Sequence, residues 1–133
     1  MEETLLLIKP DAIERNLVGK IISRVEEAGL KILGIKMVFF SREMTEQFYG
    51  EHKGEEFYNR LINYMADKNV VALKLEGMNA IKTLRSLVGA TDPKKAEKNT
   101  IRADFGLGTP QNSVHASDSA KSVVRELKFF FGD

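Results

Sequence analysis

The run TLLLIKP at residues 4–10 is a short apolar segment that a proline stops. Four consecutive apolar side chains in such a run are typical of a buried strand. Because the residue before a proline is biased toward extended backbone, we expect the strand to end at Lys9 and a loop that could carry catalytic groups to begin there. A buried strand needs other elements to cover it, so the flanking sequence should supply them.

The segment after this strand has the periodicity of an amphipathic helix. Residues 17–28 space their apolar side chains by three or four positions, and Gly29 follows where a helix commonly ends. We expect this apolar stripe to cover a sheet. Its members are Leu17, Ile21, Ile22 and Val25.

The rest of the chain alternates strands with helices. Between residues 89 and 112 the chain lacks a long periodic segment, and because ordered loops of that length are uncommon, a functional loop is favoured. The expected elements are a strand at 30–39, two short inserted helices at 45–51 and 57–66, a half-buried strand at 71–76 ended by Gly77, a helix at 81–88, a brief strand at 113–115, and a closing helix at 120–127 with Ser117 or Asp118 as its N-cap.

Composition limits the function classes. The 133 residues are 43% apolar, which suits a single domain spanning 1–133 with its own core. Twenty Lys and Arg against nineteen Asp and Glu give a formal charge of +1, so no overall field attracts nucleic acid or an anionic membrane. The absence of cysteine excludes disulfides and thiolate chemistry, and two histidines are too few for a histidine metal cage. The opening apolar run is too short for a signal peptide, so we expect a cytoplasmic protein.

Common catalytic signatures are missing from the sequence. It contains no G-x-x-x-x-G-K-[ST], no G-x-G-x-x-G that opens a helix, and no G-x-S-x-G elbow. What remains is His115 with Lys9, Arg85 and Arg102, all where elements end or loops begin. A neutral imidazole can accept a phosphoryl group, and Glu126 on the closing helix could orient its second nitrogen. A lone histidine is nevertheless more often a turn residue, so spacing alone leaves the function open.

Five longer stretches give a more specific signal when they are taken in order. They are TLLLIKPDA, FYGEHKGEEFY, LVGATDP, TIRADFG and NSVHASDS, beginning at residues 4, 48, 87, 100 and 112. Together they resemble the nucleoside-diphosphate kinase family over nearly the whole chain. K-P-D-A near the start combined with N-x-x-H-x-S-D-S near the end is highly specific. Unlike His115, His52 in the second stretch is interpreted as an ordinary polar residue.

The resemblance implies both a fold and a reaction. Family members have a ferredoxin-like α+β fold, a four-stranded antiparallel sheet covered by helices (βαββαβ with an inserted helix pair), and assemble as hexamers or tetramers. The implied reaction is a ping-pong transfer of the γ-phosphate from a nucleoside triphosphate to a nucleoside diphosphate through phosphohistidine on His115. Mg²⁺ would travel on the nucleotide phosphates, so the protein would need no metal site of its own.

The resemblance also assigns site residues. Lys9 would bind the transferring phosphate and the 3′-hydroxyl of the sugar, which Asn112 would also contact. The other phosphates would be held by Arg85, Thr91 and Arg102. Around the nucleophile, Tyr49 would lie beside His115 and Lys9, and Ser117 would bond to Glu126, which holds the second nitrogen of His115. The base would stack on Phe57 with Leu61 and Thr109 nearby, and recognition by faces predicts broad base specificity.

Three positions depart from the family pattern. Ala116 and Ala103 stand where glycine is usual, and Gln111 stands where arginine is common. If the backbone at Ala116 required a positive φ, alanine would cost on the order of 1 kcal/mol.

Two other functions are kept open: a non-catalytic nucleotide sensor, which Ala116 mildly favours, and an RNA-binding module, which the missing aromatic run and the balanced charge disfavour.

Overall fold

The computed structural model describes residues 1–132. Its strands are β1 (Glu2–Ile8), β2 (Lys31–Phe40), β3 (Lys68–Gly77) and β4 (Val114–Ala116). Over the described residues they form one four-stranded sheet in the order β2-β3-β1-β4, with antiparallel pairing throughout. In this sheet Leu6 pairs with Leu73 on one side and with Ala116 on the other. The predicted ferredoxin-like α+β fold is confirmed.

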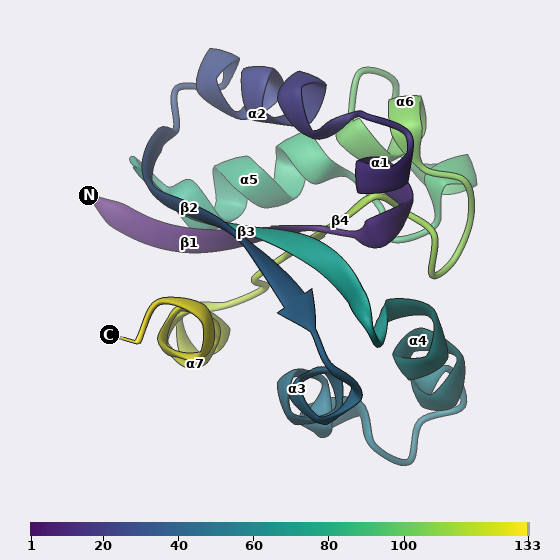
Figure 1. Ribbon diagram of the computed structural model, residues 1–133. Coiled ribbons are helices and arrows are strands. Elements are labelled where there is room, and N and C mark those ends of the chain that lie inside the picture. The colour runs from purple at the N-terminus through teal and green to yellow at the C-terminus, as the bar shows by residue number, and fades with distance from the viewer. Residues whose placement is uncertain (133) are drawn as a thin grey trace.

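Helices cover both faces of the sheet (Figure 1). On one face the apolar core joins α1 (Pro10–Glu14), α2 (Val18–Glu27), α5 (Ala80–Val88) and α6 (Ile101–Phe105) to the strands. The other face packs against α3 (Arg42–Phe48), α4 (Tyr58–Met65) and α7 (Ala120–Phe131). Two short 3₁₀ turns, η1 (Gly50–His52) and η2 (Pro93–Lys95), lie between these helices. The inserted helix pair of the prediction is α3 and α4.

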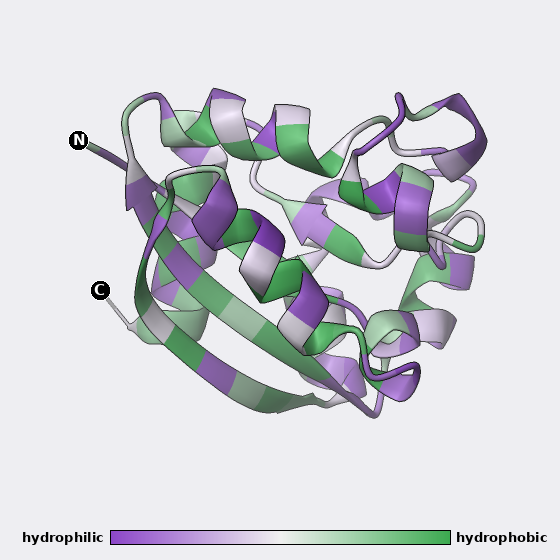
Figure 2. Cartoon of the chain, turned by 90° about the horizontal axis from the view of Figure 1, so that it is seen from above, coloured by the Kyte–Doolittle hydropathy of each residue, from purple (hydrophilic) through white to green (hydrophobic). Residues whose placement is uncertain are grey.

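Strand β1 contributes to both cores, which explains its uninterrupted apolar sequence. Leu6 and Ile8 point into the core under α2 and α5, whereas Leu5 and Leu7 point toward α7. All four side chains are fully buried, and each such burial is worth about 1.5–3 kcal/mol. Figure 2 shows the hydrophobic colour concentrated along the strands and on one side of the helices. Among residues 1–132, no helix combines the length and apolar character needed to cross a bilayer.

The prediction of a loop after the first strand is corrected at Lys9. The strand ends at Ile8, and Lys9 is the N-cap of α1, which begins with Pro10. Proline suits the first position of a helix because its missing N–H would have no partner there and its φ is already helical. Lys9 therefore sits at a rigid junction between strand and helix.

The segment 89–112 is also more regular than predicted. It contains η2 and the five-residue helix α6, whose N-cap Thr100 accepts a hydrogen bond from the N–H of Ala103 at 3.3 Å. A helix of one and a half turns is too short to show periodicity, so the pattern could not reveal it. The consequence for the site is that Arg102 is carried by a helix and not by an open loop.

The N-cap of α7 and the start of α3 differ from the prediction, although α7 begins at Ala120 as expected. Ser119, and neither Ser117 nor Asp118, caps α7 by accepting from the N–H of Ser122 at 3.1 Å. Ser117 is turned inward and buried, and Asp118 accepts from the hydroxyl of Ser122 at 2.7 Å. Similarly, α3 begins at Arg42, three residues earlier than expected from 45–51.

Candidate active site

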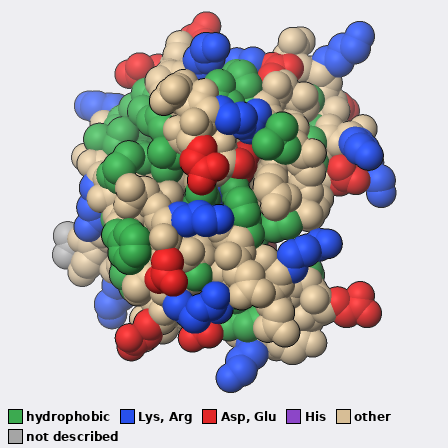
Figure 3. All heavy atoms as spheres, turned by 45° about the vertical axis from the view of Figure 1, so that its right-hand side comes forward, with side chains coloured by type: hydrophobic (Ala, Val, Ile, Leu, Met, Phe, Trp, Pro, Cys, Tyr) green, Lys and Arg blue, Asp and Glu red, His purple; other side chains and the backbone are tan. Residues whose placement is uncertain are grey.

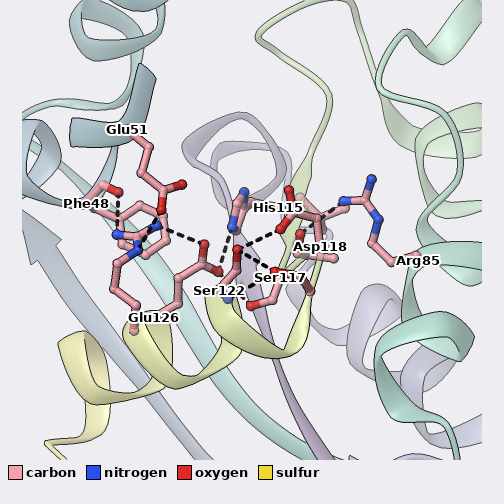
Figure 4. A network of polar contacts seen from close by, with 12 residues as sticks. Phe48, Glu51, Arg85, His115, Ser117, Asp118, Ser122 and Glu126 are labelled. Atoms are coloured by element: carbon pink, nitrogen blue, oxygen red, sulfur yellow. Dashed lines mark hydrogen bonds and ion pairs between the residues drawn. The ribbon is translucent and has the colours of Figure 1, made fainter. Parts of the chain in front are cut away.

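His115 is the middle residue of the short strand β4, paired with Leu7 of β1. Its Nε2 lies 3.0 Å from Oε1 of Glu126, and the Ser117 hydroxyl donates to the same oxygen at 2.6 Å. Arg125 contacts the other carboxylate oxygen at 3.3 Å. Figure 4 shows Glu126 and Ser117 on one side of the imidazole and Arg85 on the other.

This contact determines which nitrogen of His115 is available. Burial opposes ionisation of Glu126, but the hydrogen bond and charge of His115, with help from Ser117 and Arg125, outweigh it and hold its pKa below the usual range. An ionised Glu126 accepts a hydrogen bond, so a neutral His115 carries its proton on Nε2. The lone pair is then on Nδ1. Because Nε2 is engaged with Glu126 and His115 lines a cavity, Nδ1 is the nitrogen available for chemistry.

Aromatic rings fix the plane of the imidazole. The ring of Phe48 meets that of His115 edge to face with centroids 5.4 Å apart, and the ring of Tyr49 does so at 6.1 Å. Tyr49 is buried, and burial, with the charge of Glu126, raises the pKa of its phenol well above the usual range. Tyr49 therefore stays a neutral hydroxyl that can donate a hydrogen bond.

Lys9 is held in the wall of the cavity by its position at the start of α1. Its Nζ donates to Oδ1 of Asn112 at 2.8 Å and to the carbonyl of Pro110 at 3.2 Å. Burial, reinforced by the positive charge of Arg102, lowers the pKa of the Lys9 ammonium to about 7. An anion placed beside it would favour the charged form and reverse much of this shift.

Arg102 reaches the cavity from α6 and is buried. Its Nη1 donates to the carbonyl of Gly89 at 3.0 Å and its Nη2 to that of Val114 at 2.8 Å. Gly89 allows the start of α6 to pack closely against this backbone: its φ is +90°, and a Cβ there would lie 2.6 Å from Oγ1 of Thr100, the N-cap of α6. Burial and the nearby charge of Arg85 lower the pKa of Arg102 to about 10.

Buried donors beside the histidine lack acceptors. Within residues 1–132, Nε of Arg102 and the hydroxyl of Tyr49 are buried without a hydrogen-bond partner. Leaving such groups unpaired costs about 1–3 kcal/mol each. A ligand with several acceptor oxygens would satisfy them.

The predicted residues meet at one cavity of about 260 Å³. Ser117 and Glu126 do not line it; they lie behind His115, consistent with their predicted contacts. Asn112 is held by donating to the carbonyl of Thr91 at 2.8 Å, and Arg85 donates to that of Ala116 at 3.2 Å. The predicted residues that line the cavity are Lys9, Tyr49, Phe57, Leu61, Arg85, Thr91, Arg102, Thr109, Asn112 and His115.

Several lining residues were not among those predicted. Arg60 follows Phe57 by one helical turn, so helical spacing could have indicated it. His52 was interpreted as an ordinary polar residue, but its ring packs on Phe57 with centroids 5.3 Å apart. The additional lining residues are His52, Arg60, Pro110, Ala116 and Asp118.

The cavity brings together an imidazole with one free ring nitrogen, fixed positive groups and an aromatic side chain. Lys9, Arg85 and Arg102 provide local positive charge at the cavity, although the face drawn in Figure 3 carries charges of both signs. Such a set suits a planar base attached to a polyanion. Fold and site together define the class of phosphotransferases that act on nucleotides.

Comparison with known proteins identifies the family within this class. A family model described as Nucleoside diphosphate kinase matches residues 2–133. The chain is 51% identical over 130 residues to a nucleoside diphosphate kinase of Methanocaldococcus jannaschii, covering 98% of this chain and 93% of that protein. The chain belongs to the nucleoside diphosphate kinase family and has its enzymatic activity.

Solved structures of the family share this fold. The Aquifex aeolicus nucleoside diphosphate kinase superposes with a TM-score of 0.94 at 41% identity, covering 98% of this chain and 94% of that one. A Halobacterium salinarum nucleoside diphosphate kinase, solved in complex with CDP, gives a TM-score of 0.95 at 36% identity, covering 99% and 88%.

The two alanine departures fall on ordinary backbone. Ala116 is the last residue of β4 and Ala103 lies inside α6. In the described part of the chain, the non-glycine residues with positive φ do not include either alanine, whereas Ser113 has a φ of +75°. The cost considered for a strained Ala116 therefore does not arise. The structure offers no explanation for Gln111 in place of arginine.

Proposed function

We propose that His115 carries the phosphoryl group between two nucleotides in a ping-pong reaction. The lone pair of Nδ1 attacks the γ-phosphorus of a nucleoside triphosphate, a nitrogen–phosphorus bond forms, and the bond from phosphorus to the β–γ bridging oxygen breaks. The nucleoside diphosphate leaves with that electron pair. A second nucleoside diphosphate enters, its terminal phosphate oxygen attacks the phosphorus, and the free histidine is regenerated.

The observation that carries this proposal is the orientation of His115 between Glu126 and the cations. Glu126 holds the Nε2 proton through attack, and its negative charge stabilises the imidazole as positive charge develops. Lys9, Arg85 and Arg102 stabilise charge on the equatorial oxygens of the transferring group without having to reorganise. The Tyr49 hydroxyl would donate a hydrogen bond close to the transferring phosphoryl group. Its role stays a prediction.

The remaining polar residues would position the nucleotide. We propose that Lys9 and Asn112, already bonded to each other at 2.8 Å, receive the sugar hydroxyl, and that Thr91 binds a phosphate together with Arg85 and Arg102. The base would lie against Phe57, with Leu61 and Thr109 nearby, and would be held by its faces. Contacts to the faces of a base discriminate little between bases, which supports broad specificity. The CDP complex of the Halobacterium relative agrees with a pyrimidine nucleotide as substrate.

The donor set of the cavity fits a Mg²⁺ ion that enters on the nucleotide. Mg²⁺ prefers oxygen ligands, retains several waters and is commonly bound through substrate phosphates with one or two carboxylates. Asp118 places a carboxylate at the cavity among the cations. We propose that the phosphates hold the ion with Asp118 beside it, where it would neutralise phosphate charge.

Incubation with γ-labelled ATP tests the proposal. The protein should acquire an acid-labile, base-stable label, as expected for a nitrogen–phosphorus bond, and addition of GDP or CDP should discharge it to the corresponding triphosphate. A protein that binds nucleotides without becoming labelled would instead be the non-catalytic sensor considered from the sequence.

Glu126→Gln should slow phosphorylation of His115 by about 10- to 100-fold, less than loss of the histidine itself. A hydrogen bond to a charged group is worth about 1.5–3 kcal/mol, and the amide can still accept from Nε2 while it no longer balances the developing charge. Single-turnover labelling with ATP measures the effect. Damage equal to that of removing His115 would contradict an orienting role for Glu126.

Phe57→Ala should raise the apparent KM for every nucleotide, by about 5- to 50-fold, because stacking contributes about 1–3 kcal/mol per base and Phe57 is partly exposed. The ratio of kcat/KM between purine and pyrimidine nucleotides should change little. Steady-state kinetics with ATP, GTP and CTP provide the measurement. A strong new preference would show that recognition depends on hydrogen bonds to the base edges.

We also propose a homo-oligomer, and the edge strand β2 supports it. Ile35, Met37 and Phe39 alternate along this strand and are 50%, 58% and 59% exposed. An edge strand with unpaired backbone groups and exposed apolar side chains is suited to pairing with another copy. Sedimentation equilibrium would distinguish a hexamer from a tetramer.

A single domain over 1–133 and a cytoplasmic location stay predictions.

A further inference from the structure

Asp11 is a buried carboxylate that the proposed reaction does not use. It lies two residues after Lys9 in the first turn of α1 and is 5% exposed. Burying a carboxylate is costly unless its oxygens are hydrogen-bonded. Its position near the phosphate-binding side chains, and the number of its partners, indicate a purpose beyond packing.

Three side chains donate hydrogen bonds to Asp11. The hydroxyl of Tyr64, on α4, donates to Oδ1 at 2.5 Å and accepts from the Asp11 backbone N–H at 2.7 Å. On the other oxygen, Oδ2 accepts from the Ser113 hydroxyl at 3.1 Å and from Nη2 of Arg15 at 3.1 Å. Arg15 also donates to the carbonyl of Phe105, at the end of α6. The carboxylate thus joins α1, α4 and the segment before β4.

The Ser113 contact bears on the phosphate end of the cavity. Ser113 has a φ of +75°, a conformation that costs a non-glycine residue free energy and needs support from its surroundings. Its carbonyl accepts from the backbone N–H of Lys9 at 2.9 Å, and it lies between Asn112 and the strand that carries His115. Asp11 therefore stabilises the backbone that sets Asn112 against Lys9.

The Tyr64 contact bears on the base end. Tyr64 follows Leu61 by one turn of α4, and Phe57 is the N-cap of the same helix. Burial, with the hydrogen bond to Asp11, raises the pKa of the Tyr64 phenol far above its usual range, so it remains a hydrogen-bond donor. A shift of α4 relative to α1 would therefore require breaking two hydrogen bonds between Tyr64 and Asp11.

We propose that Asp11 and Tyr64 form a positioning pair that sets the distance between the base platform on α4 and the phosphate-binding groups at Lys9 and Asn112. Neither residue lines the cavity formed by the described residues, so they act through the groups they hold. Misplacement by about 1 Å can cost about 100-fold in rate because transfer requires an aligned phosphorus. This inference rests on the proposed transfer through His115.

The test compares two phosphoryl donors with His115 as acceptor. ATP must span both ends of the cavity, whereas phosphoramidate has no base: its phosphorus–nitrogen bond breaks, ammonia leaves, and the same phosphohistidine forms. Tyr64→Phe removes the hydroxyl alone. It should lower labelling by limiting ATP about 10- to 100-fold, the range for losing a buried hydrogen bond to a charged group, and change labelling by phosphoramidate less than about twofold.

A second variant and a control complete the experiment. Asp11→Asn should slow labelling by both donors, because it also releases Ser113 and so disturbs Asn112 and Lys9. Tyr58→Phe, on the same helix but outside the network, should change neither rate. A lowered Tm with ATP labelling unchanged in Tyr64→Phe, or equal losses with both donors in that variant, would overturn the positioning role. Failure of the wild-type protein to label with ATP would overturn the proposed function as well.

Discussion

His115→Ala should abolish the covalent phosphoenzyme and lower phosphoryl transfer by about 10⁴-fold or more, the scale seen when a nucleophile is removed from an otherwise intact site. The reason is geometric. In the proposed reaction Nδ1 of His115 is the nucleophile, and Glu126 holds the other ring nitrogen; alanine would leave the cations in place without an acceptor for the phosphoryl group. Labelling by γ-labelled ATP, followed by quantification of acid-labile phosphate, measures the loss.

The second histidine provides the matched control for this variant. His52 also lines the cavity, but it packs on Phe57 and its Nδ1 lies 3.6 Å from Glu55, on an exposed turn. His52→Ala should therefore keep the acid-labile label, although its apparent KM can rise because the platform under the base is disturbed. If the label persisted in His115→Ala and disappeared in His52→Ala, the phosphoryl acceptor would be His52, and the proposed role of His115 would be wrong.

Much of the fold was predictable because apolar periodicity reports burial directly. The uninterrupted apolar run from Leu5 to Ile8 predicted a strand buried on both faces. Apolar residues three and four positions apart predicted α2 and α4. Strand order was not predictable, because β1 pairs with β3 and β4, which lie 60 or more residues further along the chain. Local sequence contains no record of such pairing.

The candidate site was predictable mainly through resemblance, since polar residues carry no periodicity. Ser117 could equally have capped α7, and only its burial against Glu126 separates the two interpretations. Asp11 illustrates the limit more clearly. The sequence places it beside Lys9, but its link to Tyr64, 53 positions away, depends on the packing of α1 against α4. Side chains that position other side chains become visible only in three dimensions.

Loss of Lys9 should be the other large effect. Lys9→Met should lower kcat/KM by about 10²- to 10³-fold, the range for removing one preorganised group that stabilises transition-state charge. The lysine is buried and donates to Asn112. Steady-state kinetics with saturating donor and varied acceptor measure the loss, and a decrease of less than about fivefold would contradict a role in transfer.

The lowered pKa of Lys9 predicts how kcat/KM should change with pH. Burial, together with the charge of Arg102, lowers the pKa of the free enzyme's ammonium to about 7, so Lys9 is charged below that pH and increasingly neutral above it. Since kcat/KM reports ionisations of the free enzyme, it should fall above about pH 7 by roughly tenfold per pH unit. In the complex the phosphates favour the ammonium, so kcat should hold to higher pH. Lys9→Met should lack this fall of kcat/KM above about pH 7. The ionisations of the nucleotide are the same for both proteins, so they cannot account for the difference.

Proton uptake measures the same shift directly. If Lys9 is largely neutral in the free enzyme at pH 8 and charged in the ADP complex, binding should take up nearly one proton there and almost none at pH 6, where both states are charged. Calorimetric titrations in buffers of different ionisation enthalpy report this number. Uptake at pH 8 that is the same in wild type and Lys9→Met would mean that another group takes up the proton, and the local field at the start of α1 would need a different explanation.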